Sequence, residues 1–190
     1  KQKLIDAGTQ LIKNAYYDDI SIEDITALCG VSKGTFYVHF DSKDQFFYSI
    51  CHANYEKLNS ILTDESIPSY LERIRKYIKA WVDINKTMSR YFMQNWYSHL
   101  FDADYHADAS GSNTLSDEFK KALITCLDNA KKAEEIISDA PIEDMADFIL
   151  INLYGFDLYH TIQHQRMDVS AWKRDLSTLV VDRYLKNPLP

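Results

Sequence analysis

Hydrophobic residues recur three and four positions apart along nearly the whole chain, which is the spacing of one face of an α-helix. In the first segment, for example, Leu4, Ile5, Leu11 and Ile12 would lie on one side. Capping residues, glycines and prolines separate the segments. The pattern predicts an all-α protein with nine helices, at about residues 2–15, 21–28, 33–40, 43–62, 69–86, 87–101, 116–138, 142–165 and 170–186.

The second and third predicted helices lie close together in the sequence and have clear ends. Ser21 is an N-cap candidate because Asp24 follows three residues later, as in a capping box. Gly30 can adopt a positive φ where the second helix ends, and Ser32 can cap the third helix. Two helices joined by a four-residue turn, at 29–32, have the spacing of a helix-turn-helix.

The third predicted helix has one apolar side and one open side. At 100° per residue, Phe36 and Phe40 fall together and would face the first two helices. Gly34 and Val38 fall on the opposite side, where a glycine lets the backbone approach another molecule closely. Thr35 and Val38 could contact a thymine methyl group or a base edge in the major groove.

Charge limits how such a helix could bind DNA. The 190 residues carry a formal net charge of −7, so no global basic field attracts a polyanion. A local patch must supply the attraction. Lys33 and Tyr37 can reach phosphates, and Lys43 lies in the first turn of the next helix, beside backbone N–H groups that favour an anion.

Composition argues against several other classes of protein. The fractions of hydrophobic (46%) and charged residues (26%) are ordinary for a globular protein, and five Gly and four Pro argue against a many-turned β-fold. The longest uncharged runs have eleven residues, short of the roughly 20 that span a bilayer, so we expect no membrane partner. Cys29, Cys51 and Cys126 are scattered, which favours reduced thiols and a cytoplasmic location.

The helix-turn-helix region also carries a longer motif. It reads Ile22-Glu23-Asp24-Ile25 and then Cys29-Gly30-Val31-Ser32-Lys33-Gly34-Thr35-Phe36-Tyr37-Val38-His39-Phe40-Asp41-Ser42-Lys43. This stretch resembles the DNA-binding segment of the tetracycline-repressor (TetR) family. The resemblance implies a nine-helix, two-domain homodimer, in which a larger helical domain holds an effector pocket and the dimer interface. We place the helix-turn-helix domain at residues 1–47 and the effector-binding and dimerisation domain at residues 48–190.

The resemblance also assigns roles to residues. Six of them match positions that commonly contact DNA in the family: Lys33, Gly34, Thr35, Tyr37, His39 and Lys43. The helix geometry adds Val38, and Ser32, the cap candidate directly before the third helix, is included with them. The predicted DNA-binding residues are therefore Ser32, Lys33, Gly34, Thr35, Tyr37, Val38, His39 and Lys43.

Nine aromatic residues fall between residues 70 and 105. Such rings bury a large area, and Tyr and Trp keep a polar group that can orient a small molecule. Packing in a core is the alternative, because aromatic residues at helical spacing form a core more often than a pocket. The candidate effector-binding residues are Trp81, Phe92, Trp96 and Tyr97.

The last two predicted helices suit a subunit interface. The eighth is apolar on more than one side and the ninth has an apolar stripe, and a helix that is apolar nearly all round must be covered on both sides. We predict a two-fold dimer through a four-helix bundle, in which Gly155 would permit close helix approach. The candidate dimer-interface residues are Phe148, Ile151, Gly155, Leu158, Tyr159, Leu176, Val180 and Tyr184.

Two patterns resemble metal sites but lack essential features. His160 and His164 lie four residues apart, as zinc ligands can, yet the segment lacks the Glu of a zinc protease motif and an obvious third ligand. Acidic residues alternate at 102–108 as in a calcium loop, but Ala107 stands where that loop needs Gly. We therefore expect no metal and no cofactor.

These observations predict a ligand-responsive transcriptional regulator and not an enzyme. It would bind a palindromic double-stranded DNA operator as a homodimer and act as a repressor that a small-molecule effector releases. No nucleophile elbow, phosphate loop or catalytic carboxylate pair is recognisable in the sequence. Two alternatives stay open: a transcriptional activator of the same fold, and a helical protein-interaction adaptor that does not bind DNA.

Overall fold

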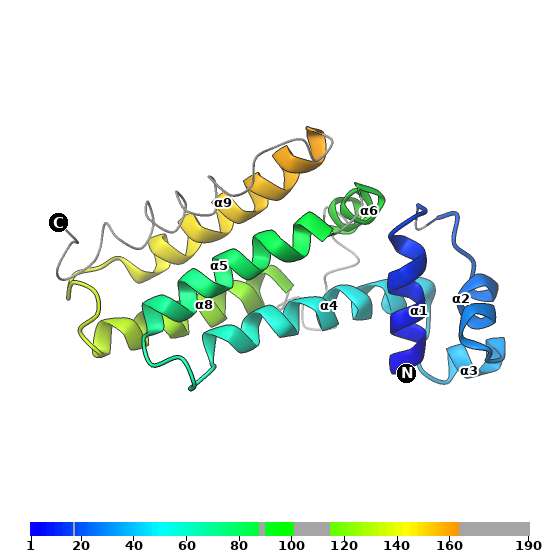
Figure 1. Cartoon of the computed structure of the whole chain (residues 1–190), viewed down its shortest axis with the longest axis horizontal. Helices are drawn as coiled ribbons and strands as arrows, with labels where there is room; N and C mark the ends of the chain where they lie inside the picture. Colours follow the sequence, from blue (N-terminus) through cyan, green and yellow to red (C-terminus); the bar gives the residue numbers. More distant parts are fainter. Residues whose placement is uncertain (17, 88–89, 101–114, 164–190) are drawn as a thin grey trace. The chain divides into compact units, whose positions relative to one another are not determined.

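The structure is a computed structural model that describes residues 1–16, 18–87, 90–100 and 115–163. It confirms the all-α prediction, because these residues form eight helices and no strand (Figure 1). The helices are α1 (Gln2–Ile12), α2 (Ile22–Cys29), α3 (Lys33–Tyr37), α4 (Lys43–Leu62), α5 (Tyr70–Thr87), α6 (Arg90–Leu100), α8 (Leu115–Lys132) and α9 (Ile142–Ile162). The predicted helix at residues 170–186 lies outside the described residues.

Some helices end earlier than the periodicity predicts. The differences are slight for α1 and α3, whereas α8 ends at Lys132 and not at residue 138. Glu134 has a left-handed backbone with φ 57°, and the N–H of Glu135 donates to the carbonyl of Ala130 at 2.9 Å. This arrangement closes the helix end and turns the chain away from the axis. A pattern of apolar positions does not reveal such a turn, because the apolar residues continue beyond it.

Glu135, just after this turn, caps α5. Its carboxylate accepts hydrogen bonds from the Ser69 hydroxyl at 2.8 Å and from the backbone N–H groups of Tyr70 and Leu71 at 3.0 and 2.9 Å. The first N–H groups of a helix have no partner within the helix, and a negative charge suits this end of the helix dipole. The start of α5 is therefore fixed by a residue far away in the sequence.

The described residues divide into two compact units. The first contains residues 1–56 together with α6, and the second contains residues 57–87 together with α8 and α9. α4 is shared between them, because the division falls inside this helix. The predicted domain boundary between residues 47 and 48 stays a prediction.

Phenylalanines form the core of the first unit. Phe36 and Phe40 contact the ring of Phe46 with centroid distances of 5.2 and 4.9 Å, and all three are at most 2% exposed. Gly8 of α1 makes room for this cluster, since a Cβ atom at Gly8 would lie 2.4 Å from Cζ of Phe46. The phenylalanines therefore hold α1, α3 and α4 together and fix the orientation of α3.

The second unit is a helical bundle in which α8 packs against both α5 and α9 (Figure 1). Its centre is Trp81, whose ring contacts Phe119 and Tyr154 at centroid distances of 5.2 and 5.6 Å. The indole N–H of Trp81 donates to a carboxyl oxygen of Asp157 at 2.8 Å. Burial raises the pKa of Asp157 well above its usual range. A buried polar contact thus joins α5 and α9 inside an aromatic core.

Candidate nucleic-acid interface

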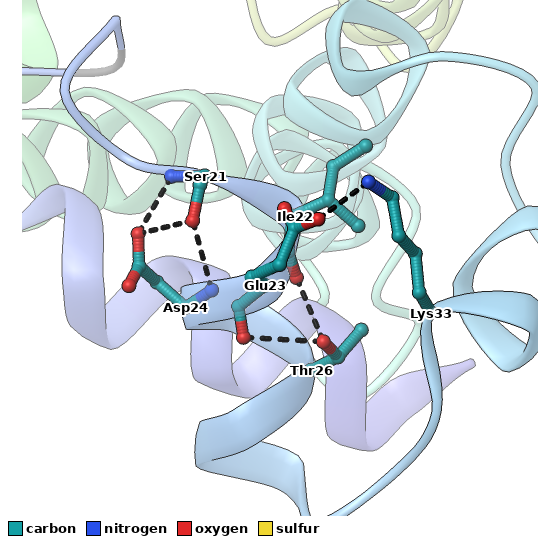
Figure 2. Close-up of polar contacts among 6 residues, drawn as sticks. All are labelled: Ser21, Ile22, Glu23, Asp24, Thr26 and Lys33. Carbon is teal, nitrogen blue, oxygen red and sulfur yellow. Dashed lines mark hydrogen bonds and ion pairs between the residues drawn. The ribbon is translucent and has the colours of Figure 1, made fainter.

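α2 begins with the capping box predicted at Ser21 (Figure 2). The backbone N–H of Asp24 donates to the Ser21 hydroxyl at 3.1 Å, and the backbone N–H of Ser21 donates to the Asp24 carboxylate at 2.8 Å. Hydrogen bonds from Ser21 lower the pKa of Asp24. Thr26 is buried and donates its hydroxyl to the carbonyl of Ile22 at 2.9 Å. The start of α2 is therefore fixed by its own sequence.

The turn between α2 and α3 depends on Gly30, which has φ 68°. The N–H of Val31 donates to the carbonyl of Thr26 at 3.0 Å, as in a Schellman motif. No atom lies within 4 Å of the place where a Cβ of Gly30 would be, so backbone conformation and not space requires the glycine. Ser32 then caps α3 by accepting from the N–H of Thr35 at 3.2 Å. These contacts confirm the predicted helix-turn-helix.

α3 turns its apolar residues inward and leaves its other side open, as predicted. Phe36 and Phe40 are 0% and 2% exposed. On the opposite side Tyr37 and Val38 are 49% and 77% exposed, and Gly34 is exposed as well. A short helix with a small exposed face can approach base edges in the major groove closely.

The other predicted DNA-binding residues lie around this face. Ser32, Lys33 and His39 are exposed, whereas Thr35 is half-buried with its hydroxyl 3.0 Å from that of Ser32. Lys43 begins α4, and its ammonium lies 3.5 Å from the backbone carbonyl of Asp18. Burial lowers the pKa of Lys43, and acidic residues nearby oppose that effect. The attraction for a polyanion is therefore confined to a few lysines.

Lys33 forms an ion pair that the sequence analysis did not predict. Its ammonium donates to the carboxylate of Glu23 at 2.5 Å, across the turn between α2 and α3 (Figure 2). This hydrogen bond lowers the pKa of Glu23 and raises the pKa of Lys33. Both side chains are more than half exposed, so the pair lies at the surface. The two residues lie ten positions apart in different helices, and the periodicity of one helix does not show which residues of two helices meet.

The candidate effector-binding residues are divided between the two units. Trp81 belongs to the core of the second unit and is 0% exposed. Phe92 and Trp96 of α6 are buried in the first unit, where their rings contact rings of α4. Tyr97, also on α6, is half-exposed. Three of the four thus contribute to the cores, and their role toward an effector stays a prediction.

α9 has an apolar side that is open to solvent. Phe148, Ile151, Leu158 and Tyr159 are between 47% and 68% exposed, and Gly155 is exposed among them. The other side of the helix is buried in the second unit. α9 is therefore apolar on more than one side, as the pattern predicts. The remaining candidate interface residues, Leu176, Val180 and Tyr184, lie outside the described residues.

The histidine and acidic patterns yield no metal site in the described part of the chain. His160 is 3% exposed and stacks on Phe156 with a centroid distance of 5.4 Å. His164, Ala107 and the acidic run at 102–108 lie outside the described residues. Within the described residues, no three His, Cys, Asp or Glu side chains gather in a way that could hold a metal ion. Within the same ranges no helix combines the length and hydropathy that crossing a bilayer requires.

The helix-turn-helix region is similar in sequence to known regulatory proteins. Residues 4–50 match the sequence model of a family described as bacterial regulatory proteins, tetR family. The HTH-type transcriptional regulator YwcC of Bacillus subtilis is 53% identical over 45 residues, which are 24% of this chain and 20% of that protein. The HTH-type transcriptional repressor DhaR of a Mycobacterium species is 33% identical over 87 residues, or 44% of this chain and 43% of that protein. The chain thus matches less than half the length of either relative.

The fold is similar to that of a solved regulator over nearly the whole chain. The crystal structure of the transcriptional regulator FadR from Bacillus subtilis in complex with stearoyl-CoA superposes with a TM-score of 0.74 at 16% identity, and the match covers 95% of this chain and 97% of that chain. At this identity the likeness concerns the fold. It agrees with the two-domain helical architecture that the sequence resemblance implies.

Proposed function

Because this chain belongs to the tetR family of bacterial regulatory proteins, we propose that it is a transcriptional repressor that binds a palindromic DNA operator as a homodimer. The observation that carries this proposal is the open face of α3. Gly34, Tyr37 and Val38 are exposed on a helix that two buried phenylalanines hold in place. Such a helix presents its side chains to a partner without having to reorganise.

The roles of the individual residues follow from their chemistry. The methyl groups of Val38 and Thr35 suit thymine methyl groups in the major groove, and the backbone at Gly34 can come close to base edges. The ammonium groups of Lys33 and Lys43 can pair with DNA phosphates. Contacts to phosphates determine the affinity and the position of the protein on DNA more than its sequence preference. DNA binding therefore combines a few cations with a small reading surface.

A homodimer compensates for the weakness of one such module. The net charge of −7 opposes binding to a polyanion, so a single helix-turn-helix should bind DNA poorly. Two modules separated by about one duplex turn, roughly 34–36 Å, engage both halves of a palindromic site together. The open apolar side of α9 provides a surface through which two chains can associate.

We propose further that a small-molecule effector releases the repressor. The indole N–H of Trp96 is buried in the first unit and has no hydrogen-bond partner among the described residues. Buried polar groups in native proteins nearly always have partners, so an effector could supply them here. Phe92 and Tyr97 of the same unit would provide aromatic contacts. A complete switch needs an effector that prefers the released state by about 10⁴-fold.

The experiment that tests the proposal is selection of duplexes from a random library by the full chain, followed by affinity measurements at several salt concentrations. Lys33→Ala should weaken binding to all sequences and flatten the salt dependence by about one unit of slope. Val38→Ala should change the sequence preference instead. Lys13→Ala is the matched control, because Lys13 is an exposed cation of the same unit outside the motif.

Failure to prefer any sequence over random competitor would overturn the proposal and favour the adaptor alternative. An activator would still select an operator, so that alternative needs a second measurement. Transcription from the selected operator should fall when the protein is added and recover with the effector. An increase on adding the protein would identify an activator.

A further inference from the structure

Arg73 of α5 is a cation buried in the second unit, with 8% of its surface exposed. Its Nε donates to the backbone carbonyl of Ile67 at 2.8 Å, and its guanidinium carbon lies 4.7 Å from the centre of the Tyr70 ring. These contacts hold the guanidinium plane but supply no negative charge. No carboxylate among the described residues lies within 4.0 Å of it, and its two terminal nitrogens have no hydrogen-bond partner there.

A buried arginine without a counter-ion is uncommon. Burying a charge is unfavourable unless the charge is paired and hydrogen-bonded, and arginines are almost never fully buried without a partner. The fold could have placed one of the nearby acidic residues against Arg73. The terminal nitrogens of Arg73 are not among the fully buried atoms that lack a partner, so they reach the surface and keep donors for a partner from outside the chain.

Space for such a partner exists beside the guanidinium. Arg73 lines a hollow of about 510 Å³, whose other lining residues come from the end of α4, the connection from α4 to α5, the start of α5, and α8. This volume lies within the range of small-molecule sites. Leu62 and Ala122 give the hollow an apolar wall, and Asn129 adds a side-chain amide that can donate hydrogen bonds. The hollow therefore offers a cation, a neutral donor and an apolar surface together.

Two of the acidic residues of this region accept their hydrogen bonds from groups other than Arg73. Glu135 accepts three hydrogen bonds as the cap of α5. Asp64 accepts hydrogen bonds from the backbone N–H and the hydroxyl of Ser66 at 2.9 and 2.6 Å, and these bonds, with smaller contributions from the charges of Lys76 and Arg73, lower the pKa of Asp64. Glu65, a third acidic residue, lines the hollow and is exposed. One positive and one negative group thus line the same space, so an anion with one charge meets less repulsion there than an anion with two.

We propose that this hollow binds a small organic carboxylate, whose oxygens pair with Arg73 and whose apolar part lies against Leu62 and Ala122. A guanidinium matches the two oxygens of a carboxylate in a fork geometry. A dianion such as phosphate would meet the charge of Glu65 and would leave the apolar wall uncovered. The site goes beyond the proposed function, uses none of the residues proposed for DNA or effector binding, and does not depend on either.

The test is calorimetric titration of the full chain with hexanoate at fixed pH and salt, with 1-hexanol and inorganic phosphate as comparison ligands. Hexanoate should bind saturably, and both comparison ligands should bind at least about ten-fold more weakly, the size expected for hydrogen bonds to a charged group. Arg73→Gln should cause a similar loss for hexanoate. Glu65→Gln should tighten binding. Lys79→Gln, which removes an exposed cation of the same helix outside the hollow, should change nothing.

Other results would overturn the proposal. Equal binding of 1-hexanol would show that charge is not recognised, tighter binding of phosphate would identify a phosphate site, and no binding of hexanoate would refute a carboxylate site. If Arg73→Gln does not fold, Ala122→Leu provides an independent variant, because it fills the hollow from α8 and keeps the cation. Hexanoate that binds to Ala122→Leu as it does to the unchanged protein would contradict the site.

Discussion

Two helices of this protein expose apolar side chains, and they do so in different ways. α3 is five residues long, and its open face consists of Tyr37 and the following Val38 beside the cation of Lys33. α9 is 21 residues long and exposes a much longer set without a charged residue among them: Phe148, Ile151, Leu158, Tyr159 and Ile162. A small face beside a cation suits a DNA groove, whereas a long uncharged stripe suits another protein surface. The size and charge of an exposed apolar face therefore indicate its partner.

The largest effect should follow from placing charges on the long stripe. In the double variant Ile151→Asp, Leu158→Asp we expect the dimer dissociation constant to rise by at least about 100-fold, because dimerisation would bury unpaired carboxylates. Both positions are exposed in the single chain, so its folding should be retained. Sedimentation velocity over a range of concentrations measures the change. Glu143→Gln, an exposed position in the first turn of α9, is the control, and a double variant that dimerises as the unchanged chain does would exclude the stripe as the interface.

The stability of the folded chain should depend on pH through Asp157, which lies on the buried side of α9. The pKa of Asp157 is raised in the folded protein, so the folded chain keeps a proton that the unfolded chain has released. The resulting stability is present below the unfolded pKa, near 4, and is lost as the pH rises through the folded pKa, by at most about 1.4 kcal/mol per pH unit. Asp157→Asn keeps an acceptor for Trp81 without titrating. In urea unfolding at pH 5 and pH 8, the variant should gain stability relative to the unchanged protein at the higher pH.

The same measurement on Asp144→Asn, an exposed carboxylate in the first turn of α9, serves as the control and should show no such gain. An equal pH response of the Asp157→Asn variant and the unchanged protein would mean that Asp157 does not hold a proton in the folded state. The aromatic core would then enclose a charged group.

Replacing one glycine on each of the two exposed faces tests both faces in the same way. A Cβ at Gly34 of α3 would meet only the Ser32 hydroxyl at 3.7 Å, and one at Gly155 of α9 would meet nothing within 4 Å. Alanine at either place should therefore stabilise its helix by about 0.5–1 kcal/mol in urea unfolding. Gly34→Ala should nevertheless weaken DNA binding and leave dimerisation unchanged. Gly155→Ala should weaken dimerisation. Undiminished DNA binding by Gly34→Ala would show that the backbone there does not approach the bases.

The elements that sequence predicted well are those that depend on neighbouring residues. Ser21, Gly30 and Ser32 each act within a few positions of themselves, and the structure confirms all three. The inward positions of Phe36 and Phe40 follow from helical geometry alone. The local sequence was therefore enough to predict the helix-turn-helix and its open face.

The contacts that sequence did not predict join residues that are distant in the chain. Glu135 caps α5 across about 65 positions, and Trp81 donates to Asp157 across 76. The hollow beside Arg73 likewise needs three separate segments to form its walls. Periodicity shows which residues are buried but not which polar groups meet, because that depends on how helices pack against one another.

The smallest expected effect concerns the ion pair of Lys33 and Glu23 beside the open face of α3. The ammonium of Lys33 is held by Glu23, so a DNA phosphate must compete with this carboxylate. Glu23→Gln should raise the affinity for all duplexes modestly and steepen the salt dependence, because Lys33 can then pair fully with a phosphate. Affinity measured at several salt concentrations checks this. Glu56→Gln is the control, because it removes an exposed negative charge from the same unit and leaves the ion pair of Lys33 and Glu23 intact. It therefore shows how much of the effect comes from the change in net charge alone. A fall in affinity would mean that Glu23 positions Lys33 for the phosphate, so the sign of the effect distinguishes competition from positioning.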